Sequence, residues 1–256
     1  MLISFEIGSR KYAADMARGI SLAIPLRFDG PQPSFFGAPQ AEAAPVKSGS
    51  FIGDVRQGGS CNVQSYHLVP HCNGTHTECI GHMVEERVSL PDYLPATPVP
   101  ATLVSVTPKS LLIDATMLQA ALLRHPLAGF HRALILRTLP NGEDKLTRQY
   151  VGPLPCAYLG LDAAELLVRT GVEHLLLDVP SLDPAEDEGR MSAHRVFWGM
   201  PATGHKLADA RRPKATVTEM IYVPDAVPDG YYLLDLQIPA FMTDAAPSRP
   251  VIYPVG

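Results

Sequence analysis

The sequence contains little cysteine and no long apolar run. Its four cysteines are too few for a disulfide scaffold, and none belongs to a Cys-x-x-Cys pair, which argues against a zinc ribbon or a thioredoxin-like motif. No apolar run approaches the roughly 18–20 residues that span a membrane. The first residues also lack the basic and apolar regions of a secretory signal. We therefore expect a cytoplasmic protein with no membrane partner.

An excess of basic residues is also absent. The chain has 21 Lys and Arg against 26 Asp and Glu, a net charge of −5, so we expect no nucleic-acid partner. With 256 residues and 46% hydrophobic residues, the chain is long and apolar enough to bury a core without staples. The 25 prolines and 20 glycines indicate many turns and loops rather than a helical bundle.

Apolar segments alternate with helical ones through the middle of the chain. Because a strand–helix–strand order is typical of α/β domains, we predict an α/β fold and one domain over residues 1–256. Asp162 is the expected N-cap of the second helix, and Gly171 follows its end. The predicted strands cover residues 62–70, 101–106, 133–138, 174–179, 216–222, 231–238 and 251–255, and the predicted helices cover 114–124 and 162–170.

Candidate metal ligands gather after the first of these strands. Four histidines, namely His67, His71, His76 and His82, and Glu78 fall within sixteen residues around a glycine. His76 and Glu78 are two positions apart, so they share one face of an extended chain. A turn at the glycine lets His71 point back to the same centre. Imidazole and carboxylate suit zinc or manganese, whereas His67 sits on the predicted strand and is expected to pack there.

The string Gly74-Thr75-His76-x-Glu78-x-x-x-His82 resembles the signature of the putative cyclase family, which includes bacterial kynurenine formamidases and isatin hydrolase. That signature reads His-x-Gly-Thr-His-x-Asp-x-Pro-x-His. Further similarities run in the family's order over roughly residues 19 to 255. They are Ile20-Ser-Leu, the 133–138 segment, Leu177-Asp-Val-Pro-Ser-Leu-Asp183, Ala193-His194-Arg195 and Thr218-Glu219-Met220.

The resemblance implies a metal-dependent hydrolase with a swivelling β/β/α fold, a mixed sheet and a homo-oligomeric assembly, either a dimer or a tetramer. It implies that His76, Glu78, His194 and Glu219 are metal ligands and that His82 is the catalytic general acid/base. The implied cofactor is a divalent metal, zinc or manganese.

The first ligand of the family motif has two candidates here. Strict spacing places Cys72 at that position, whereas treating Asn73 as an insertion places His71 there. Thiolate and imidazole both bind zinc, and we favour His71 with Cys72 as the alternative. His205 is a rival to His194 for the later histidine because it lies closer to Glu219 in the sequence.

Two departures from the family signature bear on function. Glu78 stands where the family has aspartate, and Ile80 stands where it has proline. Phe35 and Phe36, in a proline-rich loop, are candidates for the substrate pocket. The function that the resemblance implies is hydrolysis of a small amide, as in an arylformamidase that converts N-formylkynurenine to kynurenine and formate in tryptophan catabolism. The alternatives are a non-catalytic metal- or ligand-binding relative and a metal-dependent cyclase or dehydratase.

Overall fold

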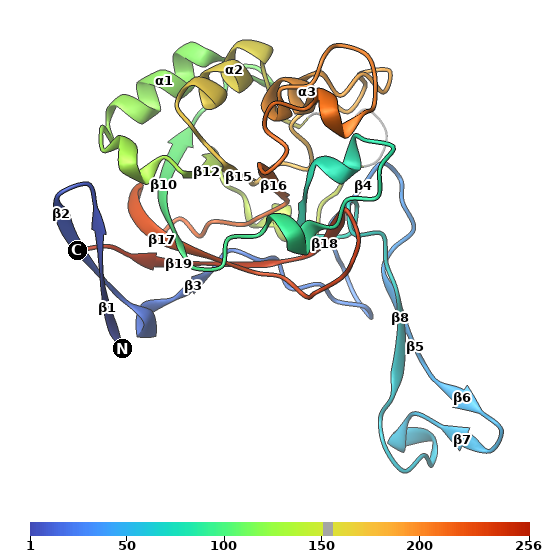
Figure 1. The fold of residues 1–256 in the computed structure, drawn as a ribbon. Coiled ribbons are helices and arrows are strands. Elements are labelled where there is room, and N and C mark those ends of the chain that lie inside the picture. The colour runs from blue at the N-terminus through green and yellow to red at the C-terminus, as the bar shows by residue number, and fades with distance from the viewer. Residues whose placement is uncertain (151–155) are drawn as a thin grey trace.

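The apolar segments of the sequence form the middle of a nine-stranded mixed sheet (Figure 1). The computed structural model describes residues 1–150 and 156–256. Four neighbouring strands, β16, β15, β12 and β10, are parallel, and the others pair antiparallel. In order across the sheet, the strands are β18 (Ala245–Pro247), β9 (His76–Glu78), β16 (Thr216–Glu219), β15 (His174–Leu177), β12 (Ala133–Thr138), β10 (Val99–Val106), β17 (Gly230–Gln237), β19 (Arg249–Pro254) and β3 (Ile20–Ser21).

The α-helices of the described residues cover one face of this sheet (Figure 1). Successive side chains of a strand point to opposite faces, so Leu134 and Leu136 pack with the helices, while Ile135 packs in the core of the other face. Cover on both faces explains why the central strands are continuous apolar runs. The helices are α1 (Ala115–Leu123), α2 (Leu161–Arg169) and α3 (Ser192–Trp198). The expected α/β fold with a mixed sheet is confirmed.

The ends of the first two helices show how the sequence sets them. The backbone N–H of Met117 donates to the Asp114 carboxylate, which caps α1. The expectation that Asp162 caps α2 is wrong, because Gly160 is the N-cap residue. Asp162 lies in the first turn of α2 instead, and its carboxylate accepts from the Ala115 N–H, 2.9 Å away, which ties the two helices together.

The described residues also form five two-stranded pairings outside the large sheet. The N-terminal hairpin joins β1 to β2, and two parallel pairs join β4 to β13 and β11 to β14. The remaining pairs, β5 with β8 and β6 with β7, are antiparallel. Their bounds are β1 (Leu2–Ile7), β2 (Arg10–Asp15), β4 (Ser34–Phe35), β5 (Glu42–Pro45), β6 (Lys47–Ser48), β7 (Phe51–Ile52), β8 (Gln64–His67), β11 (Leu112–Ile113), β13 (Gln149–Tyr150) and β14 (Tyr158–Leu159).

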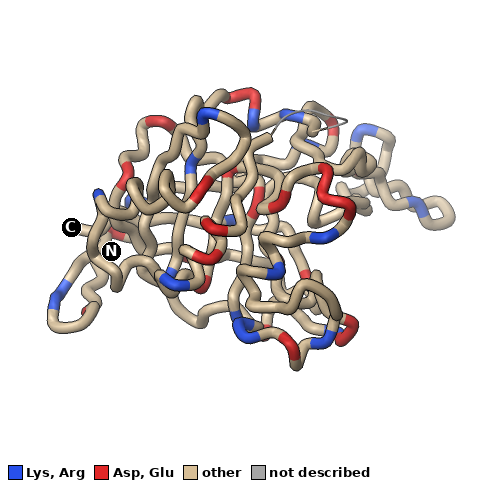
Figure 2. Tube along the Cα trace, turned by 90° about the horizontal axis from the view of Figure 1, so that it is seen from above, with Lys and Arg blue, Asp and Glu red and all other residues tan. Residues whose placement is uncertain are grey.

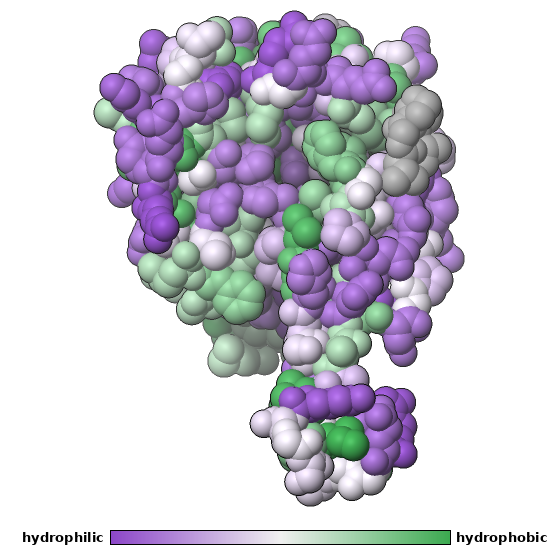
Figure 3. Space-filling model, turned by 90° about the vertical axis from the view of Figure 1, so that its right-hand side faces the viewer, coloured by the Kyte–Doolittle hydropathy of each residue, from purple (hydrophilic) through white to green (hydrophobic). Residues whose placement is uncertain are grey.

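A narrow arm, residues 42–67, projects from the body (Figures 1 and 3). Its stalk is the antiparallel pair of β5 and β8, and its tip holds β6 and β7. Hydrophobic and hydrophilic side chains are both visible on the tip (Figure 3). The residues of β8 are all exposed to solvent, so the arm contributes little to the core.

The surface charge is mixed. Acidic and basic segments are interspersed along the trace in the view onto the helices (Figure 2). Within the described part of the chain, no helix combines the length and the apolar character needed to cross a membrane.

Candidate metal centre

Strand β9 brings the two central residues of the motif into the sheet. It lies between β18 and β16, and its register sets His76 opposite Glu219 of β16. His76 and Glu78 are buried on one face of β9, as their spacing predicts. Gly74 has φ of +81°, a conformation that favours glycine and that turns the chain into the strand.

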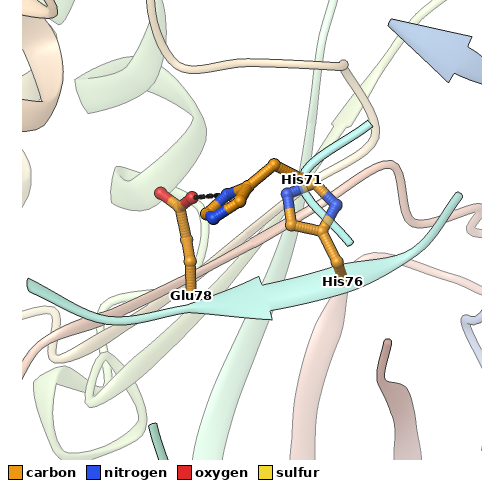
Figure 4. Close-up of side chains that lie close together, drawn as sticks. All are labelled: His71, His76 and Glu78. Carbon is orange, nitrogen blue, oxygen red and sulfur yellow. Dashed lines mark hydrogen bonds and ion pairs between the residues drawn. The ribbon is translucent and has the colours of Figure 1, made fainter. Parts of the chain in front are cut away.

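His71 reaches back to the same face from the preceding loop. Its Nδ1 lies 2.8 Å from Oε2 of Glu78, and Figure 4 shows its ring above β9, between Glu78 and His76. Cys72 has its carbonyl bound to the Phe35 N–H, at 3.0 Å. Among the described residues, the groups that could hold a metal include His71 and leave out Cys72.

Helix α3 supplies the later histidine. Nε2 of His194 lies 3.0 Å from Oε1 of Glu78 and 3.7 Å from Oε1 of Glu219. His205 instead binds the Met83 carbonyl through Nδ1, at 2.9 Å, and does not join these groups. The structure therefore brings together His71, His76, Glu78, His194 and Glu219.

Each of the histidines at the centre has one ring nitrogen held by an acceptor. Nδ1 of His76 donates to the Gly74 carbonyl, at 3.0 Å. The Nε2 atom of the neutral ring then carries a lone pair, yet it is buried, has no hydrogen-bond partner among the described residues and lies 3.4 Å from Oε2 of Glu219. Two acceptors that face each other in a buried site are stabilised by a cation between them. This donor set therefore fits a divalent metal.

The histidines and carboxylates of the centre shift one another's pKa values. Burial opposes ionisation of Glu78, but the charge of His82 and the hydrogen bonds from His194 and His71 hold its pKa well below the usual value. Burial would lower the pKa of His71, but hydrogen bonds to Asp244 and Glu78 outweigh it and raise the pKa to about 10. The pKa of His194 is likewise raised, by Asp183 and Glu78 against the effect of burial. A bound metal would displace these protons.

His82 lies between the carboxylates of Glu78 and Asp244, and its Nδ1 is 3.8 Å from Oδ2 of Asp244. It ends the short 3-10 turn η3 (Ile80–His82), and its Nε2 is 3.9 Å from Oε2 of Glu78. Its ring stacks on that of His71 with centroids 4.2 Å apart. About a quarter of its side chain is exposed, and it lines a cavity of about 410 Å³.

The two predicted aromatic residues have different surroundings. Phe36 is exposed and lines the cavity beside His82, together with the 181–191 loop. Phe35 is buried in a small cluster with Tyr150 and Met220. Phe36 has φ of +56°, so the backbone turns at this position and presents its ring to the cavity side of the loop.

Two aspartates at the centre contact the candidate ligand histidines, which the sequence does not predict. Asp183 lies 2.5 Å from Nδ1 of His194 and accepts from the Ala193 N–H at the start of α3. Asp244 was not predicted, and its Oδ2 lies 2.9 Å from Nε2 of His71. No local motif marks Asp244; only the pairing of β18 with β9 brings it to the site.

Comparisons with known proteins identify a family model and similar folds. The family model described as putative cyclase matches residues 20–184. No match was found among curated proteins. Three solved structures are similar over 92% of this chain: a potential metal-dependent hydrolase with cyclase activity (17% identity, TM-score 0.63, 98% of that chain), a predicted metal-dependent hydrolase from Bacillus stearothermophilus (16%, 0.62, 97%) and isatin hydrolase A from Labrenzia aggregata bound to benzyl benzoate (13%, 0.63, 93%). At these identities the structures show a shared fold.

Proposed function

The chain belongs to the putative cyclase family, and from that premise we propose that it is a metal-dependent hydrolase of a small amide. The observation that carries the proposal is the unpartnered Nε2 of His76, which faces the carboxylate of Glu219 in a buried site. The structural neighbours that are named as hydrolases support the reaction class.

Two overlapping groups of residues would hold the metal. His71, His76 and Glu78 form one, and Glu78, His194 and Glu219 form the other, with Glu78 shared. Imidazole and carboxylate ligands suit zinc or manganese. A divalent metal bound there supplies Lewis acidity toward a carbonyl oxygen and makes water more acidic.

His82 would carry the proton between water and the leaving nitrogen. A proton carrier must reach the reacting atoms from the substrate side, and His82 lines the cavity together with Asp183, the partner of His194. Its distance of 3.9 Å from Glu78 leaves the ring near the reaction but outside the two groups that share Glu78.

The cavity suits a small aromatic amide. Its volume is about 410 Å³, and apolar side chains, namely Phe36, Pro184, Ala185 and Met191, line it beside four acidic residues, Asp183, Glu186, Asp187 and Glu188. We propose an arylformamidase-like reaction, with N-formylkynurenine hydrolysed to kynurenine and formate. Isatin, the cyclic amide named for one structural neighbour, is the second substrate to assay.

A pair of matched variants tests this function. Glu78→Gln removes the charge of the carboxylate that both ligand groups share. Glu85→Gln makes the same chemical change at an exposed glutamate nearby in the sequence and serves as the control. We expect Glu78→Gln to lose at least 100-fold in turnover of N-formylkynurenine or isatin, because it disturbs both ligand groups. Glu85→Gln is expected to match the unmodified protein. Equal activity of the two variants would overturn the proposal.

The projecting arm supports a homo-oligomer. An isolated two-stranded hairpin is marginally stable in water, so an arm that leaves the body gains stability from a second subunit. A groove of about 880 Å³ is lined by residues of both the arm and the body, with Tyr66 from the arm and Phe28 and Phe241 from the body. We propose that the arm contacts a second copy of the chain, most simply in a two-fold dimer.

The four free cysteines support a reducing, cytoplasmic setting.

A further inference from the structure

We propose that Asp244 is a positioning residue, which fixes the ring of His71 so that its Nδ1 faces the metal position at Glu78. This role rests on the proposed metal-dependent function. Asp244 lies outside residues 20–184, the part of the chain that the family model matches.

The ring of His71 lies between two carboxylates. Nε2 is 2.9 Å from Oδ2 of Asp244, and Nδ1 is 2.8 Å from Oε2 of Glu78. A neutral imidazole carries one N–H, and the hydrogen bond at one nitrogen decides which nitrogen offers its lone pair. With Nε2–H donated to Asp244, Nδ1 is left to coordinate an ion beside Glu78. Histidine ligands of metals are commonly oriented in this way.

The backbone around Asp244 is held firmly in place. The Asp244 carbonyl accepts from the Cys79 N–H at 2.9 Å, and the Thr243 carbonyl accepts from the Leu90 N–H at 2.8 Å. Gly81 allows this approach, because a Cβ at that position would lie only 2.8 Å from Cβ of Asp244. The carboxylate is therefore placed by the pairing of β18 with β9, next to Glu78.

The other two histidines of the centre are also oriented by a hydrogen bond from one ring nitrogen to an outer acceptor. Nδ1 of His194 binds Asp183 while its Nε2 faces Glu78. Nδ1 of His76 binds the Gly74 carbonyl while its Nε2 faces Glu219. Asp244 gives His71 the matching outer acceptor, so all three rings direct one nitrogen toward the carboxylate of Glu78 or of Glu219.

Cobalt binding to the full chain tests this role. Co²⁺ reports its ligands through its visible absorption, and competition with a chelator gives its affinity. We expect Asp244→Ala to weaken Co²⁺ affinity about 10–100-fold, the usual effect of losing an outer partner of a ligand. At saturation the visible spectrum should keep the shape seen with the unmodified protein. Asp244→Asn, which keeps an oxygen acceptor, should recover most of the lost affinity, and the exposed Asp92→Ala variant should lose none.

The outcomes separate the possible roles. Unchanged affinity in Asp244→Ala would overturn the positioning role alone. A changed spectrum at saturation would also overturn it, because Asp244 would then be a ligand together with His71 and His82, a group whose atoms are close enough to hold an ion. If the unmodified protein bound no Co²⁺, the proposed metal-dependent function would fail, and this role would fail with it.

Discussion

Nε2 of His76 lies 3.4 Å from Oε2 of Glu219, with both residues buried and no hydrogen on His76 Nε2 in the tautomer that its bond to Gly74 selects. This pair joins β9 to β16, whose register sets the two residues opposite each other. Two facing acceptors in a buried site are costly unless a cation lies between them. The relationship therefore links the sheet topology directly to metal binding.

His76→Ala is expected to abolish tight metal binding. Losing an outer partner of a ligand costs about 10–100-fold in affinity, so losing the ligand itself should cost more. Equilibrium dialysis followed by elemental analysis measures the bound metal. His67→Ala is the matched control, because His67 is an exposed residue of β8. A His76→Ala protein that retains a full equivalent of metal would show that His76 is not a ligand.

His82→Ala should separate chemistry from metal binding. Because His82 lies beside the carboxylates and lines the cavity, we expect metal content near that of the unmodified protein. Turnover should fall by roughly 10²–10⁴, the usual contribution of a general acid or base. Metal analysis and a turnover assay on the same sample check this. Loss of metal together with activity would instead identify His82 as a ligand.

His174 should make the protein less stable in acid. Burial lowers its pKa from 6.5 to about 4, so the folded chain resists a proton that the unfolded chain accepts. Stability from this residue is therefore present above pH 6.5 and is lost as the pH falls toward 4, by about 2 kcal/mol at pH 5. Urea unfolding of the metal-free protein at pH 7 and pH 5 measures the loss.

His174→Asn keeps an amide near Thr216, the partner of His174, and removes the titration. This variant should be less stable at pH 7, and its stability should fall less between pH 7 and pH 5. The exposed His67→Asn variant should follow the unmodified protein. An identical pH dependence in His174→Asn would refute the assignment.

Shortening the arm should change the assembly. Replacing residues 46–63 with Asn-Gly joins Pro45 to Gln64, which already pair across the stalk, through a turn that suits a hairpin. We expect sedimentation of the unmodified chain at micromolar concentration to show a homo-oligomer, and the shortened chain to sediment as a monomer. A monomeric unmodified chain would rule out the proposed role of the arm.

The sequence predicts the parts of the fold that depend on local pattern. The continuous apolar run 133–138 identifies β12, and the two-residue spacing of His76 and Glu78 places them on one face of a strand. The prediction that Asp162 caps α2 is wrong, because Gly160, rather than Asp162, precedes the first turn. The contact of Asp244 with His71 depends on how β18 pairs with a strand far away in the chain, which no local pattern reveals.

The most direct test of the account is release of formate from N-formylkynurenine, measured on one preparation before chelation, after chelation and after the metal is restored. We predict about one or two equivalents of zinc or manganese in the purified protein, since two ligand groups share Glu78. We also expect hydrolysis that is lost with the metal and regained with it. Hydrolysis that persists in fully metal-free protein, or a metal-loaded protein that hydrolyses neither N-formylkynurenine nor isatin, would contradict the proposed metal-dependent function.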